Sequence, residues 1–274
     1  MIDKFDYAEP NCPLCNGEDF YYPKKDAPLG RIPVERIIRK IDSLFDKNDY
    51  TEAGRLLVYW RNEAVDLKDK SGELAMENEL VGYYRKQNDM ENGLASVSRA
   101  LALTEELNQD DMASGATVFL NCATAYKAFA MADKAMPLYE RAEQIYKSTL
   151  SAEDARFGGL YNNMALALAD LERFEQAENA YFKALGIMES IPTGATEAAI
   201  TYINLAHMYE NCGKETKIGD CMKRACELLQ SKDIPHDGYY AFVLEKCAPS
   251  FGYFGDTEIY ERMMMEAEEI YARS

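Results

Sequence analysis

The sequence predicts an all-α protein in which about six helical hairpins follow one another and stack into a right-handed α-α superhelix. Three observations predict this class. The chain repeats itself at a nearly constant interval, its small and apolar residues recur at helical offsets, and turn signals separate the periodic stretches. A single helical hairpin cannot bury its apolar face, so consecutive hairpins stack to form one continuous core.

The interval is clearest at one position that carries large side chains. Its occupants are separated by 40, 42, 42, 41 and 42 residues and are Leu44, Tyr84, Tyr126, Leu168, Tyr209 and Phe251. Three residues before each of them stands a smaller residue: Ile41, Val81, Ala123, Ala165, Ala206 or Ala248. Spacings of three and four residues place side chains on one helix face, where small residues allow two helices to approach closely.

The predicted units fill the chain after a short leader. Residues 1–32 do not fit the repeat and are expected to form an N-terminal cap, and the hairpins lie near residues 33–70, 71–111, 112–153, 154–194, 195–236 and 237–274. Turn-forming residues separate the two helices of a hairpin at KNDY (47–50), QNDMENG (87–93), NCGKE (211–215) and FGDTE (254–258). Between hairpins, SIPTGATE at 190–197 supplies a Pro and Gly break.

Composition excludes several function classes. Lys and Arg number 30 and Asp and Glu number 47, so the net charge is −17, which opposes binding to nucleic acid or to an anionic membrane surface. The sequence MIDKFDYAEPNC lacks the features of a signal peptide, and no apolar run approaches a membrane span. Seven scattered cysteines fit reduced intracellular thiols. We therefore expect a cytoplasmic protein.

Repeats three and four carry a resemblance to a known family. Their sequence, YERAEQIYKSTLSAEDARFGGLYNNMALALADLERFEQAENAYFKAL, resembles the tetratricopeptide repeat (TPR) in the long, 42-residue form of kinesin light chain and many bacterial regulators. The resemblance covers roughly residues 33–274. It implies a non-enzymatic scaffold that binds proteins or peptides along the concave groove lined by the first helix of every hairpin.

Asparagines form a column on the predicted concave face. Reading the position of Asn163 through the repeats gives Arg39, Glu79, Asn121, Asn163, Asn204 and Lys246. A carboxamide offers a donor and an acceptor, which suits the backbone of an extended peptide. The resemblance implies that Asn121, Asn163 and Asn204 hold peptide backbone. The alternative is that each amide ties its own hairpin to the backbone of its neighbour, and both readings can hold together.

Other inner residues are expected to set ligand preference. These are Asn162, Lys127 and His207, and for His207 a polar groove lining is favoured over catalysis because no partner for acid–base chemistry stands at useful spacing. The carboxylate-clamp subgroup of the family is rejected, because Asp42 and Glu79 at inner positions would repel a carboxylate. A ligand of mixed or basic character suits the acidic chain better.

The leader adds one motif outside the repeat. Cys12 and Cys15 form a C-x-x-C, which can begin a zinc site or a redox pair, but no second pair of ligands follows nearby. We expect no cofactor and no metal, with free thiols in a turn favoured over a metal or redox protein. The leader is expected to cap the first hairpin, or alternatively to occupy the groove itself.

Two further readings stay open. One is a regulator whose repeats sense a small peptide, although the leader is short for an effector domain. The other concerns assembly, because solenoid ends leave apolar surface uncovered, so the MMM run at 263–265 near one end could support a homo-oligomer.

Overall fold

Only helices and their connections occur in the described part of the chain. The computed structural model describes residues 28–273 apart from 46, 48, 192, 232 and 233, and the predicted all-α class is confirmed for them. The chain divides into two compact units, residues 1–131 and 132–274, which are described separately below. The division falls within the third predicted repeat. Cys12 and Cys15, like the rest of the leader through residue 27, lie outside the described residues.

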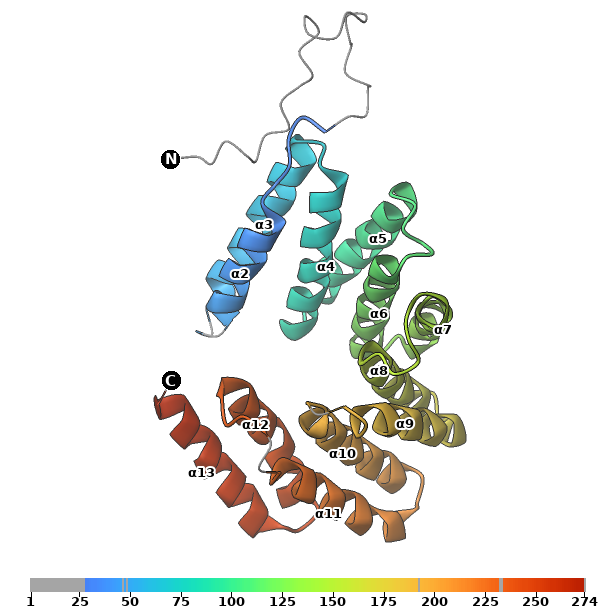
Figure 1. Cartoon of the computed structure of the whole chain (residues 1–274), viewed down its shortest axis with the longest axis vertical. Coiled ribbons are helices and arrows are strands. Elements are labelled where there is room, and N and C mark those ends of the chain that lie inside the picture. Colours follow the sequence, from blue (N-terminus) through green and yellow to red (C-terminus); the bar gives the residue numbers. More distant parts are fainter. Residues whose placement is uncertain (1–27, 46, 48, 192, 232–233, 274) are drawn as a thin grey trace, which may run out of the picture. The chain divides into compact units, whose positions relative to one another are not determined.

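Five helices make up the described part of the first unit (Figure 1). They are α2 (Val34–Phe45), α3 (Tyr50–Asp66), α4 (Lys70–Lys86), α5 (Met90–Glu106) and α6 (Ala113–Ala128). Each helix packs against the next, and α4 also contacts both α2 and α6. The first helices of successive hairpins therefore form one layer, as the repeat predicts, and α3 and α5 pack behind them.

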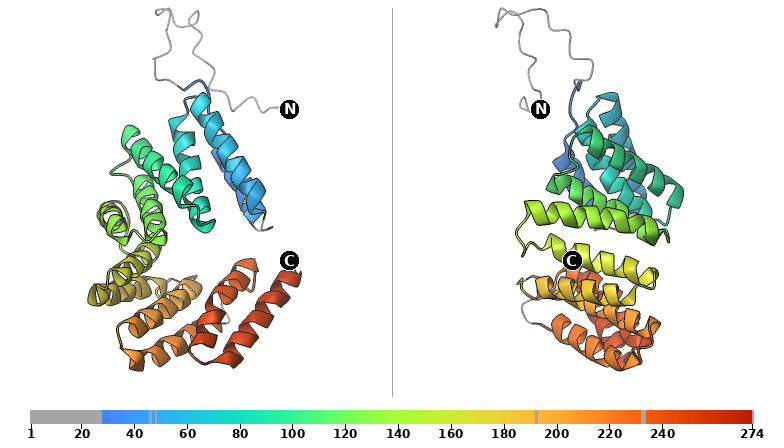
Figure 2. Two further views of the ribbon diagram at one scale, coloured as in Figure 1. Left: turned by 180° about the vertical axis from the view of Figure 1, so that it is seen from behind. Right: turned by 90° about the vertical axis from the view of Figure 1, so that its right-hand side faces the viewer.

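The second unit continues the same pattern with seven α-helices (Figures 1 and 2). They are α7 (Ala132–Thr149), α8 (Arg156–Asp170), α9 (Phe174–Met188), α10 (Ala195–Asn211), α11 (Ile218–Leu229), α12 (Gly238–Tyr253) and α13 (Thr257–Arg273). A short 3-10 turn, η1 (Glu215–Lys217), precedes α11. α8 pairs with α9, α10 with α11 and α12 with α13, while α10 contacts both α8 and α12.

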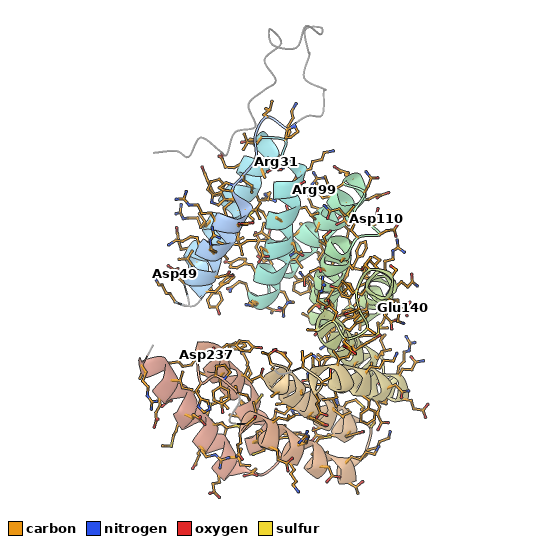
Figure 3. All side chains as sticks on the ribbon, in the orientation of Figure 1. Arg31, Asp49, Arg99, Asp110, Glu140 and Asp237 are labelled. Carbon is orange, nitrogen blue, oxygen red and sulfur yellow. The ribbon has the colours of Figure 1, made fainter. Side chains whose placement is uncertain are left out.

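The turns inside the hairpins share one backbone geometry. In the five described turns from α4–α5 onward, one residue has a positive φ: 55° at Asn88, 58° at Ala130, 58° at Glu172, 70° at Gly213 and 97° at Gly255. Glycine and asparagine enter this left-handed region more readily than other residues, so the local sequence favours the turn at three of these five positions. An aspartate caps the following helix in the first two hairpins. The carboxylates of Asp49 and Asp89 accept hydrogen bonds from backbone N–H groups in the first turns of α3 and α5. Figure 3 marks Asp49 at the start of α3.

The core follows the predicted alternation of small and large residues. Alanines at the repeated small positions are fully buried, among them Ala123, Ala165, Ala206 and Ala248. Between them lie large side chains, and Tyr139 and Tyr181 of the second helices are also fully buried. The Tyr181 hydroxyl makes no hydrogen bond within the described structure. Burial, with the nearby Asp170 charge, raises the pKa of this phenol.

Helix α4 carries two buried carboxylates that link it to its neighbours. Glu77 lies 2.9 Å from the Arg61 guanidinium on α3, and its side chain is 1% exposed. Glu73, one turn earlier, accepts two hydrogen bonds of 2.6 and 3.0 Å from Arg99 on α5, which Figure 3 labels. A buried carboxylate requires such a partner, because its desolvation is otherwise uncompensated.

Replacing Tyr181 by Phe should leave the protein as stable or more stable, by up to about 1 kcal/mol, because a buried hydroxyl without a partner costs free energy. The matched change is Tyr209→Phe, which removes the 2.6 Å bond from the Tyr209 hydroxyl to Glu178 and should destabilise by about 1.5 kcal/mol. Urea unfolding followed by circular dichroism measures both. A clear loss of stability in Tyr181→Phe would show that its hydroxyl is bonded.

Removing Arg61 should destabilise the first unit strongly. Arg61→Ala leaves the Glu77 carboxylate buried without its cation, so we expect a loss of about 3 kcal/mol. Arg61→Met combined with Glu77→Met should recover most of it, because an apolar pair of similar volume carries no desolvation cost. Arg55→Ala, which breaks an exposed pair with Glu52 on α3, is the control and should leave the unfolding midpoint unchanged. Equal effects of Arg61→Ala and Arg55→Ala would contradict the assignment.

Candidate functional site

In the first unit, the asparagine of the column bonds to the hairpin before it. Asn121 is half-buried on α6, and its Nδ2 donates to Oδ1 of Asn78 on α4 at 2.9 Å. This bond uses one of the two N–H groups of Asn121 and leaves its carbonyl oxygen available. Asn78 stands one residue before the column position and was not among the predicted site residues. The repeat register could have identified it, because Asn78 occupies the same position as Asn162.

The second unit contains the same bond between two other hairpins. Asn204 on α10 donates through Nδ2 to Oδ1 of Asn162 on α8 at 3.2 Å. The pairs Asn78–Asn121 and Asn162–Asn204 therefore link equivalent positions. In both, an amide bonds to the amide of the preceding hairpin rather than to backbone. Asn121 and Asn204 thus link neighbouring hairpins, but through a side-chain amide and not through the backbone contact that was expected.

Asn163 differs from its neighbours in the column. It is half-buried on α8, and its side chain makes no hydrogen bond among the described residues. In the repeat register, the third repeat has Leu120 at the position that Asn78 and Asn162 occupy in the second and fourth. Asn163 therefore presents both a donor and an acceptor that the fold does not use. Its amide is the column member with the most unused hydrogen-bonding capacity.

His207 takes part in the packing of α10 on α12. Its Nε2 lies 2.9 Å from the Ser250 hydroxyl, and its ring lies against Phe254 with centroids 4.8 Å apart. The Glu210 carboxylate is 3.7 Å from Nδ1. With 39% of its side chain exposed, His207 is both a link between hairpins and part of the accessible surface. Lys127 lies half-buried in the last turn of α6, in the first unit.

Exposed aromatic side chains on α12 were not selected from the sequence. Tyr239, Phe242 and Tyr253 are between 45% and 65% exposed. The Lys246 ammonium, at the column position of α12, lies 5.5 Å from the centre of the Phe242 ring. Spacings of three, four and seven residues put these four side chains on one face. The helical spacing of these residues did not predict that they are exposed, because aromatic residues at such spacing are more often buried in the core.

Two acidic residues expected on the inner surface, Asp42 and Glu79, influence one another electrostatically. Glu79, the column residue of α4, is half-buried, and burial together with the nearby Asp42 charge raises its pKa. The Lys86 charge and a hydrogen bond with Asn78 oppose this rise. Two acidic side chains that influence one another in this way would disfavour a third carboxylate beside them, which agrees with the rejection of a carboxylate clamp in this unit.

The described cysteines behave as core residues or simple thiols. Cys122 and Cys247 are buried, as predicted, and burial raises the pKa of both thiols to about 12. No cluster of His, Cys, Asp and Glu suited to a metal ion occurs among the residues that the structure describes. The predictions for Cys12 and Cys15 fall outside those residues. None of the described helices is both long and apolar enough to cross a lipid bilayer.

Comparisons with known proteins identify the fold. No protein-family model matches the sequence, and no curated protein matches it significantly. Among solved structures, the nearly identical TPR-like repeats of a kinesin-light-chain-type protein from Podosopora anserina match with a TM-score of 0.59 and 16% identity, covering 71% of this chain and 94% of that one. A single-substitution variant of it gives 0.61. BtubC (BKLC) from P. vanneervenii matches at 0.52 and 20% identity, covering 89% of this chain and 92% of its own.

These likenesses show that the chain has the TPR-like helical-repeat fold. The resemblance read from the sequence, including the long repeat of kinesin light chain, is confirmed at the level of the fold. The identities of 16% and 20% leave function to be argued from the residues of this chain.

Glu79→Gln tests the acidic part of the inner surface through pH. Because the folded pKa of Glu79 lies above its ordinary value of 4.5, the carboxyl group stabilises the fold fully below that value, and this contribution is lost as the pH rises through the folded pKa. The variant should therefore unfold at a higher temperature than the wild type at pH 7, and the difference should shrink towards pH 4. Thermal unfolding at both pH values measures it. Glu91→Gln, at an exposed site on α5, should show no such pH-dependent gain.

Proposed function

We propose that this protein is a non-enzymatic scaffold that binds partner proteins by holding an extended peptide along the first helices of its hairpins. The observation that carries the proposal is the unused, half-buried amide of Asn163 beside the bonded pair Asn162–Asn204. The TPR-like fold supports it, because a solenoid of hairpins offers an extended row of first helices as a binding surface.

The chemistry of the amide suits backbone recognition. One carboxamide can accept from the N–H and donate to the C=O of a single residue in an extended chain. Such contacts do not depend on the ligand's side chains. Asn163 offers both groups, whereas Asn121 and Asn204 each retain a carbonyl oxygen and one N–H after bonding to the preceding hairpin. The three column residues would then share one role.

The surrounding residues set the preference for the ligand. Asp42 and Glu79 disfavour an acidic segment in the first unit, where Lys127 is a cationic inner candidate. In the second unit, the partly exposed His207 and the aromatic side chains of α12 favour apolar or aromatic residues in the ligand. With a net charge of −17, the protein should prefer segments of neutral or basic character.

A selected peptide tests the proposal. Peptides chosen from a random displayed library against the full chain are labelled, and their affinity is measured by fluorescence anisotropy. Asn163→Ala should weaken binding about 5- to 30-fold, the loss of a hydrogen-bonding group worth about 1–2 kcal/mol. Asn179→Ala, at an exposed site on α9, is the matched control and should bind as the wild type does.

Backbone recognition has a sharper signature in the ligand. Methylating the one amide nitrogen that faces Asn163 should weaken binding to the wild type but have little further effect on Asn163→Ala, because the two changes remove the same bond. If the double variant Asn163→Ala with Asn204→Ala retained full affinity for every selected peptide, peptide capture by the column would be ruled out. Asn162→Ala separates the link between hairpins from the binding contact.

A further inference from the structure

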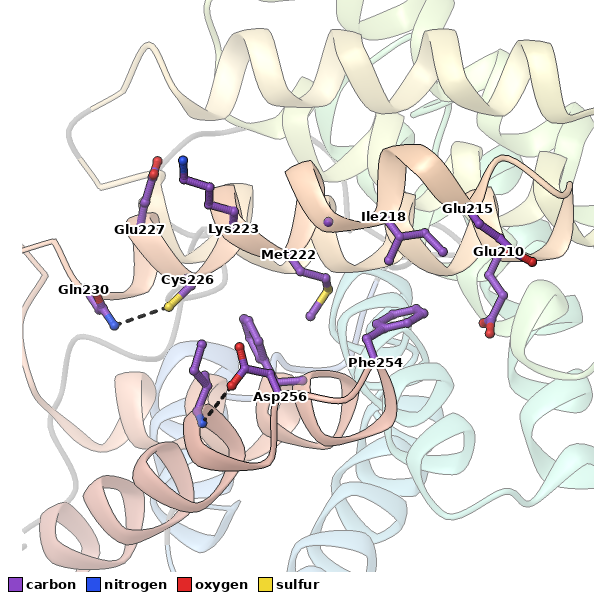
Figure 4. Close-up of a pocket in the computed structure, with 13 residues that line it drawn as sticks. Glu210, Glu215, Ile218, Met222, Lys223, Cys226, Glu227, Gln230, Phe254 and Asp256 are labelled. Carbon is purple, nitrogen blue, oxygen red and sulfur yellow. Dashed lines mark hydrogen bonds between the residues drawn. The ribbon is translucent and has the colours of Figure 1, made fainter.

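The second unit contains a large hollow between α11 and the last hairpin, α12–α13. Its volume is about 710 Å³, within the range of ligand-binding cavities. Figure 4 shows Ile218 and Met222 of α11 extending towards α12, with Phe254 facing them from the end of α12. Phe251 and Ile259 complete the apolar walls. This hollow is formed mainly by second helices and turns, and none of the column asparagines lines it.

The equivalent place one repeat earlier is filled by a charged cluster. Glu178 on α9 accepts hydrogen bonds from the Tyr209 hydroxyl at 2.6 Å, Lys214 at 3.0 Å and Lys217 at 2.7 Å. Although burial opposes the shift, these three partners lower the pKa of Glu178 to about 2. The cluster joins α9 to α10 and to the turn before α11. That junction is therefore closed by a side chain from each element.

All four members of the cluster are replaced in the next repeat. In the repeat register, Glu178 corresponds to Gly219, Tyr209 to Phe251, Lys214 to Asp256 and Lys217 to Ile259. Each replacement residue lines the hollow. The central carboxylate has become a glycine, and a side chain built on Gly219 would meet no atom within 4 Å. The hollow is therefore present where the hydrogen-bonded cluster that joins the earlier hairpins is missing, and where Phe251 and Ile259 replace two of its polar members.

The last hairpin is fixed to α11 by a buried hydrogen bond, so the hollow does not result from a detached C-terminal hairpin. The Tyr240 hydroxyl, near the start of α12, donates to the Leu229 carbonyl at the end of α11 at 2.9 Å, and this bond is buried. α10 also contacts α12. These contacts hold the walls of the hollow in place without filling it.

Charge at the rim selects the kind of ligand. Glu210, Glu215 and Asp256 are among the lining residues. Lys223 is the one lysine of the lining, so carboxylates outnumber lysines there. An occupant that is apolar on one side and cationic at its edge would match both the walls and the rim.

We propose that this hollow is a docking site for a basic amphipathic helix of a partner protein. Apolar side chains spaced three and four residues apart on such a helix would enter between Ile218, Met222 and Phe254, as in other helix-in-groove interfaces. Its Lys or Arg residues would lie beside Glu210, Glu215 and Asp256. The volume of the hollow admits several side chains at once, which favours a helix face over a single anchor. The site is separate from the peptide column proposed above.

Three model peptides test the site on the full chain. One is a labelled helical peptide of Leu and Lys with the Leu residues on one face, the second replaces Leu by Ser, and the third replaces Lys by Glu. Fluorescence anisotropy in 50 mM and 300 mM salt gives the affinities. We expect the Leu–Lys peptide to bind at least tenfold more tightly than either control peptide, and to weaken as salt increases.

The decisive variant keeps the net charge of the protein. Gly219→Leu fills the hollow from within α11, where leucine is a better helix former than glycine, and it should reduce binding of the Leu–Lys peptide at least tenfold. Gly186→Leu, at an open position of α9, is the matched control and should bind normally. Circular dichroism should show both variants folded, with Gly219→Leu at least as stable as the wild type.

Two results would overturn the proposal. Equal affinity of wild type and Gly219→Leu for the Leu–Lys peptide would place binding elsewhere, and equal affinity of the Leu–Lys and Ser–Lys peptides would reduce it to surface charge. Asn163→Ala should not change binding of these peptides. The column and the hollow can therefore fail independently.

Discussion

The close approach of neighbouring helices over fully buried alanine side chains is the constraint on which the rest of this structure depends. Ala123, Ala165, Ala206 and Ala248 occupy the same place in successive first helices, and none has any exposed surface. With so little side chain between the backbones, each helix fits only one neighbour geometry. Larger residues such as Tyr139 and Tyr181 then fill the space that the alanines leave between pairs.

This close approach also decides which polar side chains meet. Asn78 bonds to Asn121, and Asn162 bonds to Asn204. In both pairs the column residue of one first helix lies within hydrogen-bonding distance of the residue just before the column position on the preceding first helix. A buried polar group that finds a partner in this way favours a single register between hairpins, whereas one without a partner costs free energy. Asn163 makes no such bond among the described residues. Asn121 and Asn204 therefore link hairpins within their own units, whereas the amide of Asn163 stays unbonded.

The junctions between hairpins show how a small sequence change alters a surface. Around Glu178, hydrogen bonds from a tyrosine and two lysines close the junction. Around Gly219, the equivalents of the carboxylate, the tyrosine and one lysine are a glycine and two apolar residues, the other lysine is replaced by Asp256, and a hollow opens instead. The fold tolerates the exchange because α12 is held by α10 and by the bond from Tyr240 to Leu229. A repeat protein can therefore acquire a site at one junction without disturbing the others.

The sequence by itself determined the helical class, the hairpin turns and the buried alanines, because these follow from local periodicity and from residues such as Asn88 and Gly213 that suit a left-handed turn. It also pointed to the asparagine column, since the repeat register is visible in the chain. Only the tertiary structure decided which amide bonds to which, that Asn78 belongs to the set, that His207 bonds to Ser250, and that α11 and α12 leave a hollow between them. These outcomes depend on distances between residues about forty positions apart, which the packing of helices sets and local pattern does not encode.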